Sequence, residues 1–165
     1  MITLKGRVAY VFGDDFDVDE IVGVENIRTF DIEFLKRICM TPFEDGFADR
    51  VAKGDLLVAG RNFGYGHPHD QPMLAMRALG IAGVVAESFA PLFARSETFN
   101  GFPLLACPGI AVAASRGDDI TVEWEAGTVT VGRTNARLDG IPPSPDAVEL
   151  VTAGGGHSLL MSRRA

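Results

Sequence analysis

The chain has 165 residues and a mass of 17.6 kDa, which predicts a single domain spanning residues 1–165. Its formal charge of −7 argues against nucleic-acid binding, which needs clustered Lys and Arg, so we expect no nucleic-acid partner. No stretch approaches the ~20 apolar residues of a membrane span, and residues 1–15 do not resemble a secretion signal. We therefore expect a cytoplasmic protein with no membrane partner.

The order of elements predicts an α/β fold, because runs of apolar residues alternate with helical patterns. In chain order we first expect a strand at 6–12, an acidic loop at 14–20, a helix capped by Thr29 or Asp31 that ends at Ile38, and a short helix at 43–51. A strand at 56–59 and a helix at 71–79 follow, the helix lying between its cap Asp70 and Gly80. A strand at 81–86, a helix near 90–98 and a strand at 104–106 complete this part. This spacing predicts a parallel core.

The pattern changes after Asp118. Residues 120–125 alternate in polarity, Ala126-Gly127 supplies a turn, and residues 128–131 alternate again. This predicts an antiparallel β-hairpin with one buried face, which we interpret as an appendage to the parallel α/β core. Beyond it, Asp146 is expected to cap a short C-terminal helix.

Cys39 and Cys107 are the only cysteines, and they form no CxxC motif. An iron–sulfur cluster usually takes three or four cysteine ligands, so two thiols cannot hold one alone. We therefore expect no cofactor in this chain. Any cluster chemistry would have to come from another chain.

The glycine-spaced turn after strand 56–59 is the strongest candidate site. Gly64 and Gly66 allow positive φ and close backbone approach, so the turn can wrap tightly around a ligand. The helix at 71–79 points its unpaired N–H groups and positive dipole end at the same place. We expect an anion site for a carboxylate or phosphate, with the amides of Gly64 and Gly66 facing outward.

Short motifs follow one another along nearly the whole chain: Phe12-Gly13-Asp14 with Asp17-Val18-Asp19, Ile27-Arg28-Thr29-Phe30, Lys53-Gly54-Asp55, 58–64, 86–90, 101–104 and 125–129. In this order they resemble the aconitase family, and within it the small subunits of isopropylmalate dehydratase. The resemblance implies a swivelling β/β/α domain in a heterodimer with a large catalytic subunit. It also implies that the large subunit carries a 4Fe-4S cluster as Lewis acid, and that the pair moves water on and off a small hydroxy-acid.

One motif departs from this family. Its glycine turn normally continues as Gly-Ser-Ser-Arg-Glu, in which the first serine is the catalytic base and the arginine binds a substrate carboxylate. This chain has Gly66-His67-Pro68-His69-Asp70 instead. The resemblance puts His67 at the base position, and a neutral imidazole is a competent base at about pH 7. His69 replaces the arginine, whose bidentate grip on a carboxylate has no imidazole equivalent.

Several interpretations stay open on the sequence alone. Arg28 and Thr29 match the family loop that contacts the variable side group of the substrate, although a helix cap beside a surface arginine explains them equally well. Loss of the serine and the arginine also suits a non-catalytic ligand-binding or regulatory domain. A third reading is a metal-dependent enzyme that uses His67, His69 and Asp70, but no further fixed ligand is evident.

Overall fold

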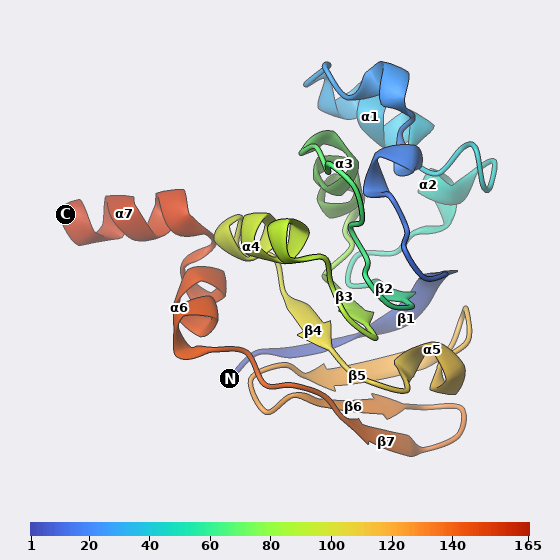
Figure 1. The fold of residues 1–165 in the computed structure, drawn as a ribbon, viewed down its shortest axis with the longest axis vertical. Helices are drawn as coiled ribbons and strands as arrows, with labels where there is room; N and C mark the ends of the chain where they lie inside the picture. Colours follow the sequence, from blue (N-terminus) through green and yellow to red (C-terminus); the bar gives the residue numbers. More distant parts are fainter.

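The computed structural model describes residues 1–165 (Figure 1). Its elements are β1 (Thr3–Phe12), the 3₁₀ turns η1 (Val18–Ile21) and η2 (Val24–Asn26), α1 (Ile32–Ile38), α2 (Phe47–Arg50), β2 (Leu56–Ala59), α3 (Gln71–Leu79), β3 (Gly83–Ala86), α4 (Pro91–Phe99), β4 (Leu104–Ala106), α5 (Ile110–Ala113), β5 (Asp119–Glu123), β6 (Thr128–Val131), β7 (Ala136–Asp139), α6 (Pro145–Ala153) and α7 (Gly156–Arg164). None of these helices has the length and apolar character that crossing a bilayer requires.

The strands form one mixed sheet in the order β4-β3-β2-β1-β5-β6-β7. The long strand β1 joins its two halves: residues 3–7 pair antiparallel with β5, and residues 8–12 pair parallel with β2. The α/β class and the parallel core are therefore confirmed. The predicted hairpin is not an appendage, however, because β1 hydrogen-bonds it directly into the sheet and β7 adds a third strand.

The sheet separates two apolar cores. Alternate residues of the buried strands face opposite sides, so that Leu57 and Ala59 belong to one core and Leu56 and Val58 to the other. Helices α1 to α4 cover the first core, with Phe47 of α2 among its buried members. The second core contains side chains from both the parallel and the antiparallel strands, so the sheet is curled around this core.

Local signals predicted the central elements well. The strands at 56–59 and 104–106 and the helix at 71–79 have the predicted bounds, and Gly80 ends α3 with a φ of 105°. Of the two caps proposed for α1, the structure uses Asp31, whose carboxylate accepts a hydrogen bond from the Phe34 amide. These features depend on contacts within a few residues, which sequence patterns describe directly.

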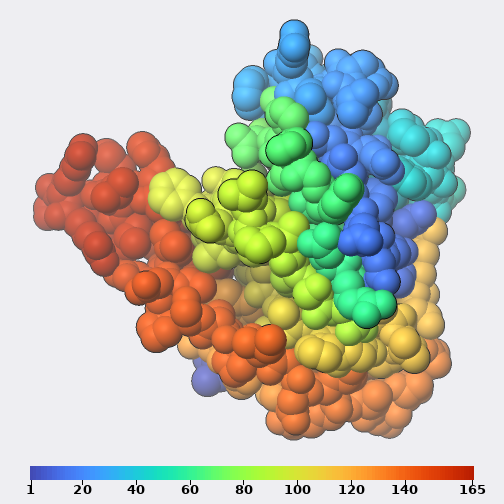
Figure 2. Space-filling view, in the orientation of Figure 1, coloured from blue at the N-terminus to red at the C-terminus, as the bar shows by residue number.

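The C-terminal region contains the main differences. Ser144, and not Asp146, caps α6, because its hydroxyl accepts a hydrogen bond from the Ala147 amide. Elements α5, β7 and α7 were not predicted from the sequence. Helix α7 begins at the last of three consecutive glycines and extends away from the body of the molecule (Figures 1 and 2). Its residues bury little surface, so no amphipathic pattern marks it in the sequence.

Candidate functional site

The candidate site lies where the parallel strands end. Phe12, Ala59, Ala86 and Ala106 are the last residues of β1 to β4, and neighbouring members of this set pair in register. The loops that follow them therefore meet at one edge of the sheet. In open α/β sheets this carboxyl-terminal edge is where ligands usually bind.

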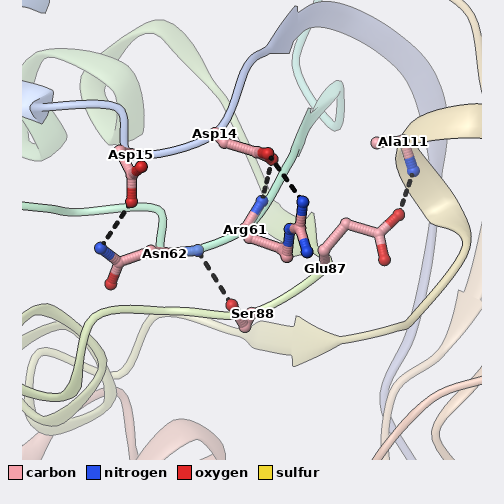
Figure 3. A network of polar contacts seen from close by, with 7 residues as sticks. All are labelled: Asp14, Asp15, Arg61, Asn62, Glu87, Ser88 and Ala111. Carbon is pink, nitrogen blue, oxygen red and sulfur yellow. Dashed lines mark hydrogen bonds and ion pairs between the residues drawn. The ribbon is translucent and has the colours of Figure 1, made fainter.

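Polar contacts clamp the loop after β2 between the loops after β1 and β3 (Figure 3). The Arg61 amide donates to Asp14 Oδ1 over 2.7 Å, and the Asn62 side chain donates to Asp15 Oδ1 over 2.9 Å. On the other side, the Asn62 amide donates to Ser88 Oγ over 2.9 Å. The hydrogen bond from the Arg61 amide is the main reason that the pKa of Asp14 lies below its ordinary value.

A second carboxylate ties the next loop to the same edge. Glu87, directly after β3, accepts hydrogen bonds from the amides of Gly109 and Ala111 over 2.7 and 3.0 Å, and the second of these is drawn in Figure 3. Both amides belong to the start of α5, whose first N–H groups would otherwise lack partners. These two clamps give the candidate site a rigid base.

Gly64 shapes the turn but does not offer its amide. The amides of Gly64 and Tyr65 both donate to the carbonyl oxygen of Phe16 over 3.1 Å, so the prediction of an outward-facing amide is wrong for Gly64. Its φ is +91°, and a Cβ placed there would lie 2.2 Å from Cγ of Phe93. The amide of Gly66, in contrast, has no acceptor within the chain, and this residue is exposed.

The two histidines of the turn have different surroundings. His67 is exposed and makes no hydrogen bond through its side chain. His69 is held by Asp19: its ring Nδ1 lies 2.7 Å from Asp19 Oδ2, and its amide donates to Asp19 Oδ1 over 2.9 Å. Asp19 was not predicted as a site residue, because it lies 50 positions away from its partner in the sequence.

The structure gives the metal reading no support. No group of three or more His, Cys, Asp or Glu side chains is placed to hold a metal ion. Asp70 occupies the N-cap position of α3, as expected, but its side chain makes no capping hydrogen bond.

Arg28 and Thr29 lie between η2 and α1, and no hydrogen bond or ion pair connects them to the histidine turn. Thr29 Oγ1 accepts a hydrogen bond from the Asp31 amide over 3.2 Å, so it supports the start of α1. Arg28 is exposed and forms no ion pair. Their contact with a substrate side group remains a prediction.

The cysteines do not fit an iron–sulfur cluster in this chain. Cys39 and Cys107 are fully buried and belong to the separate cores on opposite faces of the sheet. Burial raises the pKa of Cys39 to about 12. Burial, followed by the charges of Glu87 and Asp139, raises the pKa of Cys107 to about 11. Cluster ligands are thiolates, which these surroundings disfavour.

The histidine turn lies on an open surface. None of the three main hollows of the molecule has a residue from 60–70 in its lining. The side chains of Tyr65 and His67 are exposed. A binding site for a small molecule usually buries most of its ligand, so this surface needs a second protein to enclose one.

Comparisons with known proteins agree on one family. Residues 42–106 match the model of the aconitase C-terminal domain family. The chain is 38% identical to a 3-isopropylmalate dehydratase small subunit of Methanopyrus kandleri, over 97% of this chain and 93% of that protein. It is 35% identical to the small subunit of Halothermothrix orenii, over 92% of each.

A solved structure agrees with these relatives. The fold matches the crystal structure of a 3-isopropylmalate dehydratase of Methanocaldococcus jannaschii with a TM-score of 0.89. The match has 30% sequence identity and covers 99% of this chain and 96% of that one. The chain therefore belongs to the aconitase family, as a small subunit of the 3-isopropylmalate dehydratase type.

Proposed function

We propose that this chain works with a large subunit that carries a 4Fe-4S cluster, and that the pair dehydrates, hydrates or isomerises a small hydroxy-acid. Family membership as a small subunit supports the partner. The cysteines support a cluster outside this chain, since neither is placed to ligate one. Both are free thiols, which suits the cytoplasm, where disulfides are rare.

The exposed histidine turn at the carboxyl edge of the sheet is the observation that carries this proposal. In the enclosed complex, the cluster would act as Lewis acid on the hydroxyl of the substrate. His67 would accept the proton from the carbon next to the one that carries the hydroxyl, because its imidazole has no competing partner in the chain. The Gly66 amide would donate to the substrate, with Gly64 keeping the turn in shape. Arg28 and Thr29 would contact its variable side group.

The substrate is expected to differ from isopropylmalate in one arm. Relatives include an isopropylmalate/citramalate isomerase small subunit of Methanocaldococcus jannaschii, 34% identical to this chain, so more than one hydroxy-acid is handled among similar proteins. Here the residue that replaces the carboxylate-binding arginine is His69. A single imidazole cannot make the bidentate contact of a guanidinium.

Turnover by the reconstituted pair tests the role of His67. The chain is co-expressed with its large subunit under anaerobic conditions and assayed on malate and maleate derivatives. His67→Ala should lower kcat by about two to four orders of magnitude, the usual effect of removing a general base. His157→Ala is the matched control, because this exposed histidine lies in α7. Turnover of His67→Ala near that of the wild type would favour the non-catalytic alternative for this turn.

His67→Ser separates the base from the rest of the motif. This change restores the family residue without its arginine. A serine must be activated to an alkoxide, whereas imidazole is already basic near neutral pH. We expect the variant to remain far below the wild type on the preferred substrate. Full recovery of kcat would show that imidazole basicity is not used.

A further inference from the structure

Asp19 is a buried carboxylate whose side-chain partners both come from His69. Its side chain is 7% exposed, and its two oxygens contact the amide and the ring Nδ1 of His69 at 2.9 and 2.7 Å. The Asp19 amide is itself fixed by Asp17 Oδ1 at 3.0 Å. A buried carboxylate is costly unless its oxygens accept hydrogen bonds, so this contact determines the position of the histidine ring.

The contact also determines which ring nitrogen is available. An ionised carboxylate only accepts hydrogen bonds, so the Nδ1 of His69 must carry the proton that it shares with Asp19. In the neutral ring, Nε2 then carries a lone pair. The side chain is 46% exposed, and Nε2, on the ring edge opposite Nδ1, has no hydrogen-bond partner in the chain.

Side-chain charges around the turn disfavour an anion beside His69, contrary to the anion site expected from the glycine turn and the start of α3. The sequence from Asn62 to Met76 contains no Lys or Arg, the preceding Arg61 is paired with Asp14, and Asp70 begins the helix. Asp17 also faces the turn, since its Oδ2 lies 3.3 Å from the point where a Cβ on Gly66 would be. A carboxylate placed against His69 would meet a lone pair with negative charges behind it, whereas a hydroxyl or amide N–H would find an acceptor.

We propose that His69, positioned by Asp19, selects substrates that carry a neutral hydrogen-bond donor where a dicarboxylate substrate has its second carboxylate. This inference rests on the proposed function, since it concerns the same site. Asp19 is a positioning residue, and its effect on substrates runs through the orientation of the His69 ring.

Nitrogen NMR of the full chain tests the orientation without any activity. With ¹⁵N-labelled histidine at a pH of about 8, where imidazole is ordinarily neutral, the His69 ring should carry its proton on Nδ1. Asp19→Asn should reverse this, because the amide NH₂ donates to Nδ1. Asp17→Asn keeps an oxygen acceptor for the Asp19 amide and is the matched control, with no reversal expected. A wild-type ring protonated on Nε2 would overturn the proposal.

Substrate preference of the complex tests the selection. Malate is compared with its monoamide, which replaces one carboxylate by a carboxamide. The wild-type complex should have the higher kcat/KM on the monoamide, and His69→Arg should move the preference at least about tenfold towards malate by supplying the bidentate contact. Asp19→Asn should raise KM for the monoamide more than it lowers kcat.

The two proposals fail in different ways. A wild-type preference for malate equal to that of His69→Arg would overturn the selection by His69 while leaving the hydro-lyase intact. Failure of the wild type and of His69→Arg to turn over any hydroxy-acid in the wider panel would overturn the proposed function. The NMR result would then still report whether Asp19 fixes the ring.

Discussion

Gly64 was expected to bind a ligand, and the structure gives it a packing role. Its positive φ and the ring of Phe93 both forbid a side chain at this position. Gly66 shares the positive φ, but an added Cβ would meet only the Asp17 carboxylate, whose nearest oxygen would be 3.3 Å away. The two glycines of the turn therefore provide a matched pair.

Gly64→Ala should destabilise the isolated chain by about 2–4 kcal/mol, because backbone strain adds to overpacking against Phe93. Gly66→Ala should cost only the strain, on the order of 1 kcal/mol. Urea unfolding of the isolated chain measures both values. Equal losses for the two variants would show that the Phe93 contact relaxes without cost.

The two cysteines should be inert in the folded chain. Burial raises their pKa values to about 12 and about 11, so neither thiol ionises near neutral pH. We expect no reaction of Cys39 or Cys107 with a thiol-specific reagent in the native state, and reaction of both in denaturant. Labelling of Cys107 at the rate of a free thiol would contradict its burial beneath the sheet.

At the scale of elements, an ion pair between α3 and α4 fixes the helix that follows the histidine turn. Arg77 of α3 pairs with Glu97 of α4, and the Glu97 residue is only 2% exposed. Arg77 also lies over the ring of Phe102, 5.6 Å from its centre. This contact connects the position of the candidate site to the packing of α4.

Arg77→Met should cost about 3–5 kcal/mol of unfolding free energy, because it leaves the Glu97 carboxylate buried without its cation. The double variant Arg77→Met/Glu97→Gln should recover a large part of this loss. Arg163→Met is the control, since its pair with Glu149 is exposed and should contribute at most about 1 kcal/mol. A loss of similar size in both single variants would show that burial does not matter here.

The same pair predicts a pH dependence of stability. Burial, opposed by the charge of Arg77, raises the pKa of Glu97 above its ordinary 4.5. Between pH 4.5 and the folded pKa, the Glu97 carboxyl is more protonated in the folded state than in the unfolded state. The contribution of Glu97 to stability is therefore complete below about pH 4.5 and falls as the pH rises through the folded pKa. Glu97→Gln should therefore gain stability relative to the wild type as the pH rises. A difference that does not change with pH would contradict the raised pKa.

At the scale of the whole molecule, the chain alone lacks an enclosed site. Its histidine turn is exposed, and no residue of this turn lines one of the main hollows. Its two thiols are buried on opposite faces of the sheet. The isolated chain should therefore be colourless and inactive. Visible absorbance from an iron–sulfur cluster and hydro-lyase turnover should both require the large subunit. Cluster absorbance together with turnover in the purified single chain would refute this.

The sequence determined the features that depend on neighbouring residues. The buried strand at 56–59, the helix at 71–79 and its end at Gly80 follow from local apolar runs and caps. The family motifs, being strings of consecutive residues, were equally accessible. The departure at Gly66–Asp70 was visible for the same reason.

Only the tertiary structure decided which of these residues are free to bind. Gly64 and Gly66 look alike in sequence, but only Gly64 donates its amide to the Phe16 carbonyl and packs against the Phe93 ring. The partner of His69 lies 50 positions away on η1, a distance at which no local pattern operates. The hairpin joined the sheet because β1 is long enough to pair with both halves. Packing between distant segments supplies these contacts, and it exists only once the chain has folded.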